Sequence, residues 1–180
     1  VMGYGQVASG ALKACHKLGM KTKILRKSEY RFIPQYLSDA DVLINGISWP
    51  KRYRESAKHL VTREHIQQSN PRLIVLDLAV DFPSPIETVR PTTYSQPYYI
   101  DEKRIHISIY GYPGLVPITS TQRYSEQVLP LAQTIANNSG LRGIKNRGRL
   151  GKAIHKAVLH PRKHDWQKYQ PKVQEGSRIE

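Results

Sequence analysis

A glycine-rich turn at the start of this chain constrains its fold more than any other feature. The sequence Gly-Tyr-Gly-Gln-Val-Ala, which begins at Gly3, follows a pattern in which a strand turns sharply into a helix. Gly3 permits the tight turn, Gly5 lets the backbone approach a diphosphate, and the small Ala8 lets the helix pack close to the sheet. The spacing predicts a dinucleotide site in which the N–H groups of Gln6 and Val7 face the phosphates.

Only Val1 and Met2 precede the first glycine. A strand that feeds such a turn usually has about five or six residues. The sequence therefore predicts a first strand reduced to a stub, and we expect residues upstream of Val1 to be missing.

Helical and strand patterns alternate through the first 140 residues. Helices are expected at 7–19, at 62–68 with Thr62 as N-cap, and at 120–136. Strands are expected at 22–25, 41–45, 73–76 and 105–109, and the strand at 41–45 is apolar without alternation, as in parallel sheets. The alternation predicts an α/β fold of the Rossmann type, a doubly wound parallel sheet with a truncated first strand and a basic C-terminal extension.

Charge separates the end of the chain from its body. Of the net charge of +14, residues 141–180 carry +8. We expect a partial NAD(P)-binding domain at 1–138 and a basic extension at 139–180 that is partly helical, around 152–159, or disordered. The extension is interpreted either as a solvated tail or as a segment that binds nucleic acid or another polyanion. The second reading makes the chain a non-catalytic nucleotide-domain remnant.

The residues after the second expected strand bear on which nicotinamide cofactor is used. NAD-binding domains usually place a carboxylate there to hold the ribose 2′-hydroxyl. Here Arg26, Lys27 and Ser28 come first, and Glu29 follows. Two cations and a hydroxyl suit a 2′-phosphate, so the sequence favours NADP over NAD, with NAD as the alternative.

Three later segments carry a family resemblance. They are Asp-Leu-Ala-Val-Asp from Asp77, Glu-Thr-Val-Arg-Pro-Thr-Thr from Glu87, and Pro-Gly-Leu-Val-Pro-Ile-Thr-Ser-Thr from Pro113. Together with the glycine turn they resemble the C-terminal, nucleotide-binding portion of the alanine dehydrogenase and pyridine nucleotide transhydrogenase family. The resemblance runs from Val1 to about Ala136.

The resemblance implies roles for individual residues. Asp81 matches the family's active-site aspartate, near the nicotinamide and the substrate. Further positions that the resemblance assigns to the cofactor are Asn45, Gly46, Leu78, Val80, Tyr112 and Pro113. The chain departs from the family at Gly111, where members often carry Asn, and this departure leaves alanine in doubt as the substrate.

The resemblance also implies an activity. The Arg26-Lys27 pair is similar to the cofactor turn of the carboxyethyl-ornithine synthases, which use NADPH. We therefore expect an NADP(H)-dependent oxidoreductase acting on the CH–NH or CH–NH2 group of an amino or imino acid, with an amino acid or 2-oxo acid as substrate. In the family the substrate-binding residues lie in a separate N-terminal domain, which this chain lacks, and the full-length protein is expected to be a cytoplasmic homo-oligomer. Nothing in the sequence selects a third reading, the nucleotide domain of a transhydrogenase.

No metal site or membrane span is predicted. Cys15 is the single cysteine, and the tail histidines at 155, 160 and 164 are too loosely spaced, even with Asp165, to predict a zinc site. His106 is expected to point outward from its strand. No run of 18 apolar residues exists.

Overall fold

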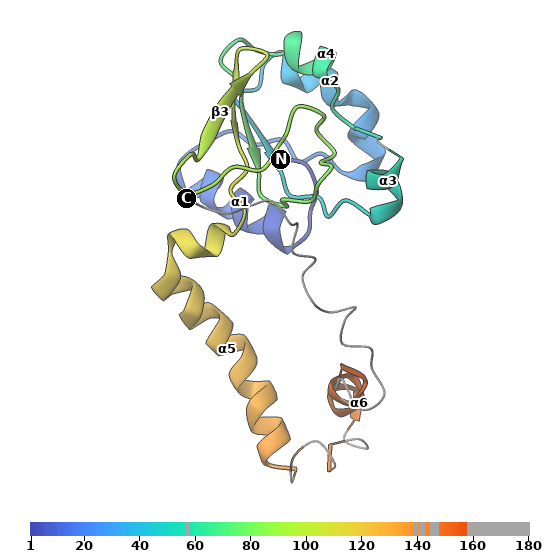
Figure 1. Cartoon of the computed structure of the whole chain (residues 1–180), viewed down its shortest axis with the longest axis vertical. Helices are drawn as coiled ribbons and strands as arrows, with labels where there is room; N and C mark the ends of the chain where they lie inside the picture. The colour runs from blue at the N-terminus through green and yellow to red at the C-terminus, as the bar shows by residue number, and fades with distance from the viewer. Residues whose placement is uncertain (57, 139, 141–142, 145–147, 158–180) are drawn as a thin grey trace, which may run out of the picture. The chain divides into compact units, whose positions relative to one another are not determined.

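The computed structural model describes residues 1–56, 58–138, 140, 143–144 and 148–157 (Figure 1). Contacts divide the chain into two compact units, Val1–Val116 and Pro117–Glu180. Each unit is described by itself below.

The first unit is built on a mostly parallel sheet. Its four strands are β1 (Val42–Asn45), β2 (Ile74–Asp77), β3 (Tyr98–Asp101) and β4 (Arg104–Ile107), in the order β1-β2-β4-β3. β1, β2 and β4 run parallel, and β3 pairs antiparallel with β4 through a hairpin. The sequence predicted the three parallel strands to within two residues at each end, but not β3.

The first strand is present as a stub that is hydrogen-bonded on both sides. Met2 forms parallel bridges to Leu25 and to Asn45. The Met2 N–H donates to the Ile44 carbonyl at 2.8 Å, and the Gly3 N–H donates to the Leu25 carbonyl at 2.9 Å. The stub therefore lies between the segment that ends at Leu25 and β1, as expected for a doubly wound sheet with a truncated first strand.

Helices surround this sheet. They are α1 (Gln6–Lys17), η1 (Lys27–Phe32), α2 (Ile33–Leu37), α3 (Lys51–Glu55), α4 (Arg63–Gln67) and η2 (Tyr112–Leu115). α1 is followed by Gly19 with φ of +69°, a backbone angle that favours glycine after a helix end. Thr62 caps α4 as predicted, because its side chain accepts a hydrogen bond from the His65 N–H.

The hydrophobic core lies on one face of the sheet, against α2 and α4. Its buried members are Met2, Leu25, Ile33, Leu37, Leu43, Val61, Ile66, Leu73, Val75, Ile86 and Val89. Ala8 and Cys15, the buried residues of α1, fall outside this cluster. The separation indicates that α1 covers the other face.

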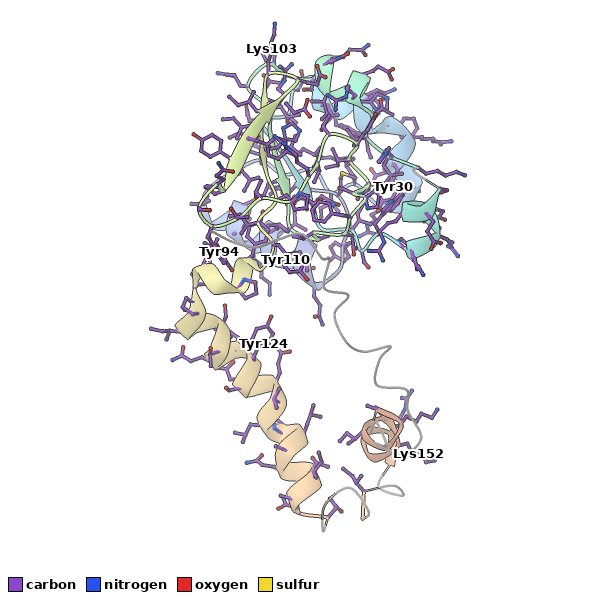
Figure 2. The ribbon with its side chains drawn as sticks, viewed as in Figure 1. Tyr30, Tyr94, Lys103, Tyr110, Tyr124 and Lys152 are labelled. Carbon is purple, nitrogen blue, oxygen red and sulfur yellow. The ribbon has the colours of Figure 1, made fainter. Side chains whose placement is uncertain are left out.

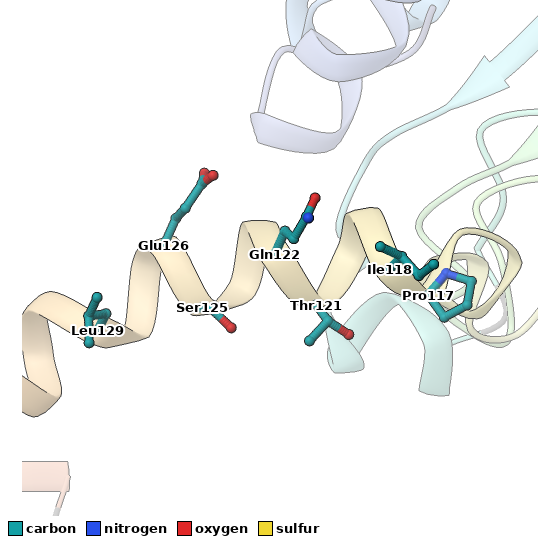
Figure 3. A pocket seen from close by; sticks show the side chains of 7 residues that line it. All are labelled: Pro117, Ile118, Thr121, Gln122, Ser125, Glu126 and Leu129. Atoms are coloured by element: carbon teal, nitrogen blue, oxygen red, sulfur yellow. The ribbon is translucent and has the colours of Figure 1, made fainter.

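The second unit contains α5 (Pro117–Ala136) and α6 (Gly148–Ala157). α5 begins three residues earlier than predicted and continues through Pro130. A hollow of about 850 Å³ runs along one face of α5, from Pro117 to Leu129 (Figure 3). All seven lining side chains come from this one helix, so no polar groups converge there from separate elements, as they do in a binding site.

Much of the basic extension lies outside the described residues, including His160, His164 and Asp165. The boundary expected at 138/139 and the polyanion-binding hypothesis therefore stay predictions. Within the described part of the chain, no helix has the length and hydropathy needed to cross a bilayer.

Candidate cofactor site

The glycine turn has the backbone that its sequence predicts. Gly3 has a φ of +93°, which side chains rarely tolerate, and a Cβ added there would lie 3.2 Å from the Gly46 carbonyl oxygen. Gly5 is the N-cap of α1, and nothing lies within 4 Å of the position that its Cβ would take. The turn is thus tight at Gly3 and open at Gly5, where a ligand would approach.

α1 packs closely on the sheet at one point. Ala8 is fully buried, and a Cβ added to Gly46 would lie 2.9 Å from the Ala8 Cβ. Both residues must therefore be small for α1 to begin where it does, which is the role that the sequence predicted for Ala8.

The N-terminus of α1 is suited to an anion. Gln6 and Val7 are exposed, and among the described residues no hydrogen-bond partner is found for their N–H groups. No acidic residue lies in the first turn, whereas His16 and Lys17 lie in the last. The free N–H groups and the helix dipole both favour a negatively charged ligand at this end.

Arg26 lies beside the glycine turn, and Glu29, the carboxylate that could hold the ribose of NAD, is already bonded to other groups. The Arg26 guanidinium stacks over the Tyr4 ring, 4.9 Å from its centroid. Glu29 accepts a hydrogen bond from the Arg26 N–H at 3.1 Å and pairs with the Lys23 Nζ at 2.9 Å. The Arg26 N–H and Lys23 together hold the pKa of Glu29 below its ordinary value. The structure thus brings Arg26 to the glycine turn and ties Glu29 back to Lys23.

A further cation near this end was missed from the sequence. Arg52 of α3 stacks over the Tyr53 ring at 4.8 Å, and its hydrogen bond and charge lower the pKa of Tyr53. The positive charge of Lys27 lowers the pKa of Tyr53 in the same direction. Ser28, beside Lys27 in η1, is exposed. No sequence signal links Arg52 to this end, because its proximity depends on how α3 packs.

The carboxyl ends of β1 and β2 are joined by a buried polar pair. The Asn45 Nδ2 donates to the Asp77 Oδ1 at 2.9 Å, and the Asn45 Oδ1 accepts from the Ile47 N–H at 3.1 Å. Both side chains are fully buried. Asn45 therefore holds Asp77 in place, and its predicted contact with the cofactor ribose stays a prediction, as does that of Gly46.

Asp77 organises the loop that follows β2. Its carboxylate accepts hydrogen bonds from the N–H groups of Ala79 at 3.0 Å and Val80 at 3.1 Å, and from the Ser84 hydroxyl at 2.8 Å. Val80 has a φ of +54°, which is strained for a β-branched residue. Asp77 was predicted only as part of the Asp-Leu-Ala-Val-Asp segment, although an acid that ends a buried strand is a signal for such a role.

Asp81 lies at the same edge of the sheet, with both oxygens engaged. Its Oδ2 accepts from the Trp49 N–H at 2.7 Å, and its Oδ1 pairs with the Arg54 Nη1 at 3.3 Å. The side chain remains 25% exposed, so the carboxylate is held in place but reachable. Leu78, whose N–H donates to the Asn45 carbonyl, is half-buried.

The loop after β4 brings Tyr112 and Pro113 into η2. Gly111 precedes these two residues and has a φ of +94°. The Tyr94 hydroxyl donates a hydrogen bond to the Gly111 carbonyl. The Tyr112 hydroxyl donates to the Ile107 carbonyl at 3.3 Å, and burial raises the pKa of Tyr112. Figure 2 shows Tyr94 and Tyr110 at one end of the first unit and Lys103, in the β3–β4 turn, at the other.

His106 is buried, so the prediction that it points outward was wrong. Its side chain has no exposed surface, lies 2.8 Å from the Thr88 hydroxyl and stacks on Tyr99. Burial lowers its pKa. Polar partners on the inner face of β4 explain why a histidine is accepted there.

Comparison with known proteins places this geometry in a family. The profile of the family described as "Alanine dehydrogenase/PNT, C-terminal domain" matches residues 6–158. Alanine dehydrogenase 1 of Staphylococcus aureus, in strains Mu50 and N315, is 31% identical over 129 residues, which cover 72% of this chain and 34% of the relative.

A solved structure of an L-alanine dehydrogenase superposes with a TM-score of 0.71 at 27% identity, covering 89% of this chain and 50% of that one. The chain thus spans about a third of the length of these relatives and half of the solved chain. The sequence profile, the fold and the glycine turn agree, and the chain belongs to the alanine dehydrogenase/PNT C-terminal domain family, a family of NAD(P)-binding oxidoreductase domains.

Proposed function

We propose that this chain is the NADP(H)-binding portion of an oxidoreductase that interconverts an amino acid or secondary amine with its 2-oxo acid. The observation that carries the proposal is the arrangement at one end of the first strand. An open Gly5 and the unbonded N–H groups of α1 lie beside the Arg26 guanidinium. The N–H groups at the start of α1 suit a diphosphate, and the Arg26 guanidinium suits a 2′-phosphate.

The preference for NADP(H) rests on what Arg26 and Glu29 do. NAD(H) binding would use a carboxylate to accept hydrogen bonds from both ribose hydroxyls. Glu29 is already bonded to the Arg26 N–H and to Lys23, whereas the Arg26 guanidinium lies on an exposed ring. Lys27 and Ser28 follow in exposed positions and add a positive charge and a hydroxyl. These groups favour a phosphate over a hydroxyl.

Asp81 is proposed as the residue of this chain that acts at the reacting centre. When bound, the nicotinamide supplies or accepts the hydride. Its bonds to Trp49 and Arg54 and its partial exposure support a role in which Asp81 orients a protonated substrate nitrogen or a water. Leu78, Val80, Tyr112 and Pro113 are proposed to border the nicotinamide. The substrate-binding groups are proposed to come from a domain outside this chain.

The test is a parallel titration of the 180-residue chain with NADPH and NADH, followed by fluorescence or calorimetry. We expect tighter binding of NADPH. Arg26→Ala should weaken NADPH binding by roughly tenfold or more, as the loss of a charge-assisted hydrogen bond does, and leave NADH unchanged.

Arg31→Ala is a matched control, because Arg31 stacks on the neighbouring Phe32 ring at 4.6 Å much as Arg26 stacks on Tyr4. It should change neither affinity. Equal affinities that are insensitive to Arg26→Ala would contradict the NADP preference alone. Absence of binding for both dinucleotides would contradict the nucleotide site itself.

A further inference from the structure

A tight turn before β3 presents one tyrosine side chain to the loop that contains η2. The turn covers residues 93–96 and is closed by two hydrogen bonds. The Thr93 N–H donates to the Gln96 carbonyl at 3.2 Å, and the Gln96 N–H donates to the Thr93 hydroxyl at 3.2 Å. Tyr94 is the second residue of this turn, so its backbone is held on both sides.

The turn is anchored to the chain that continues from β4. Thr92 forms a parallel bridge with Ile109. The Thr92 N–H donates to the Ser108 carbonyl at 2.9 Å, and the Thr92 hydroxyl accepts from the Ser108 N–H at 3.2 Å. Thr92 and Ser108 are both buried. The position of Tyr94 is therefore fixed relative to the carboxyl end of β4.

The Tyr94 side chain contacts the first turn of η2. Its hydroxyl donates to the Gly111 carbonyl, which also accepts from the Gly114 N–H at 2.8 Å. A Cβ at Gly111 would lie 3.0 Å from the Tyr94 hydroxyl oxygen. A Cβ at Gly114 would overlap that oxygen and lie 3.0 Å from the Tyr94 Cζ. Any side chain at either position would collide with the phenol, so both positions must be glycine while Tyr94 holds this conformation.

η2 lies at the edge of the sheet where the cofactor site is proposed. It follows the carboxyl end of β4, and dinucleotides bind outside the carboxyl ends of the strands in folds of this type. The Tyr112 hydroxyl donates to the carbonyl of Ile107, the last residue of β4, at 3.3 Å. Burial raises the pKa of Tyr112, and the charge of Asp77, which ends β2, raises it further. Tyr94 lies at the same end of the first unit as Tyr110, which precedes η2 (Figure 2).

Tyr94 contributes little to the hydrophobic core. It is 54% exposed and is not a member of the buried cluster. What its hydroxyl does set is the position of one carbonyl, at a glycine whose φ is +94°. The contact therefore controls the conformation of the η2 loop, residues 111–115, more than the stability of the first unit.

We propose that Tyr94 is a positioning residue that holds the η2 loop against the nicotinamide half of a bound dinucleotide. This inference rests on the proposed function, in which Tyr112 and Pro113 border the nicotinamide. In this role Tyr94 touches neither the cofactor nor the reacting atoms, and acts through the two glycines of the loop. It fixes the loop before the cofactor arrives, which reduces the conformational entropy that binding must remove.

The test compares the whole dinucleotide with its adenosine half. The probes are NADPH and adenosine 2′,5′-bisphosphate, which carries the 2′-phosphate but no nicotinamide. Binding to the 180-residue chain is measured by calorimetry. Tyr94→Phe removes only the hydroxyl, so we expect the Kd of NADPH to rise by about three- to tenfold, as the loss of one hydrogen bond does. The Kd of adenosine 2′,5′-bisphosphate should stay unchanged. The fluorescence of bound NADPH should fall, because a loosely held loop lets water reach the nicotinamide.

Tyr98→Phe is the matched control. Tyr98 is similarly exposed, at 60%, and among the described residues no hydrogen-bond partner is found for its hydroxyl. The loss of this hydroxyl should change neither affinity.

A second pair of variants tests the packing of the phenol on the loop. Gly114→Ala should weaken NADPH binding, because its Cβ would overlap the Tyr94 hydroxyl oxygen. In a Tyr94→Ala background the same change should add little, because the colliding group is gone.

Equal losses of affinity for both probes in Tyr94→Phe would overturn the proposal, because they would show that Tyr94 supports the whole domain. An unchanged affinity for NADPH would overturn it too, as would an unaltered chain that binds NADPH no more tightly than adenosine 2′,5′-bisphosphate. In these cases the nucleotide site of the proposed function would stand, since the bisphosphate still binds. If the unaltered chain bound neither probe, the proposed function and this inference would both be contradicted.

Discussion

The two ends of the stub Val1–Gly3 place backbone groups in two different environments. Toward Gly3 the chain leaves the sheet, and the N–H groups of Gln6 and Val7 gather at the start of α1. Toward Val1 the backbone groups are paired in a parallel ladder, with the segment that ends at Leu25 on one side and with β1 on the other. Convergent unpaired amides suit a compact anion, whereas the groups of a ladder already have partners. Three residues thus separate a turn that is open to a ligand from the hydrogen-bonded interior of the sheet.

The largest effect is expected where α1 meets the sheet. Gly46→Ala would place a Cβ 2.9 Å from the Ala8 Cβ and 3.0 Å from the Ala8 backbone, so α1 must move. We expect the free energy of unfolding to fall by about 1–3 kcal/mol and dinucleotide binding to weaken, as measured by urea denaturation and NADPH titration.

Gly10→Ala is the matched control for that change. Nothing lies within 4 Å of a Cβ at Gly10, inside α1, so alanine should stabilise the helix by about 0.5–1 kcal/mol. If both variants changed stability in the same direction, the close contact between α1 and the sheet would not be limiting.

The next largest effect is the pH dependence of the free energy of unfolding, which His106 in the sheet should set. Because the pKa of buried His106 lies below its ordinary 6.5, the unfolded chain binds a proton that the folded chain does not. Stability should therefore fall as the pH drops below about 6.5, by at most about 1.4 kcal/mol per pH unit, until the folded-state pKa is reached. His106→Asn should flatten this slope in denaturation curves between pH 5 and 7.

A charge at the start of α1 should distinguish helix stability from anion binding. Gln6→Glu places a carboxylate in a first turn that has none, and should raise helix stability by about 0.3–1 kcal/mol. The same charge repels a diphosphate, so affinity for NADPH and NADH should fall together by several-fold. Lys17→Glu, at the opposite end of α1, should lower stability and leave affinity unchanged. A loss of affinity in both variants would contradict a site at the helix N-terminus.

The smallest effect concerns the β3–β4 turn. Arg63 pairs with Asp101 at 2.6 Å and with Glu102 at 2.5 Å, and it lowers the pKa of both acids from ordinary values of 3.8 and 4.5. Their contribution is present above about pH 4.5 and is lost as the pH falls through the lowered values. Arg63→Ala should lower the Tm by about 2 °C at pH 7 and by less at pH 3.

Arg72→Ala is the control for that pair. Arg72 is 85% exposed, and its ion pair with Asp41 is long, at 3.8 Å. Removing this weak pair should leave the Tm unchanged at both pH values. A fall equal to that of Arg63→Ala would mean that general charge, not the paired geometry, sets the effect.

Local patterns predicted the parallel strands and the glycine turn, because continuous apolar runs and fixed glycine spacing are properties of short segments. β3 was missed because its turn uses Glu102 and Lys103 at positive φ, where no glycine or asparagine marks a hairpin. His106 was placed on the wrong face because β4 buries Arg104 and His106 and leaves Ile105 40% exposed. The partners that make this possible, Thr88 and Ser69, lie far away in the sequence.

The candidate site also has features that the local sequence predicted and features that it did not. Gly3, Gly5 and Ala8 were assigned their roles from spacing, and the structure gives them the required geometry. The bonds from Asn45 to Asp77 and from Trp49 to Asp81 each join residues 32 positions apart, so no local pattern predicts these two partners.

The carboxylate of Asp77 has a consequence for how substitutions in this loop will behave. It binds two successive N–H groups and thereby keeps Val80 in a left-handed conformation, one residue before Asp81. Asp77→Ala would let the loop relax and carry Asp81 out of register with its neighbours. A mutational survey scored by turnover alone would then rank Asp77 among the reacting groups, although its role is to hold the conformation of the loop that carries Asp81.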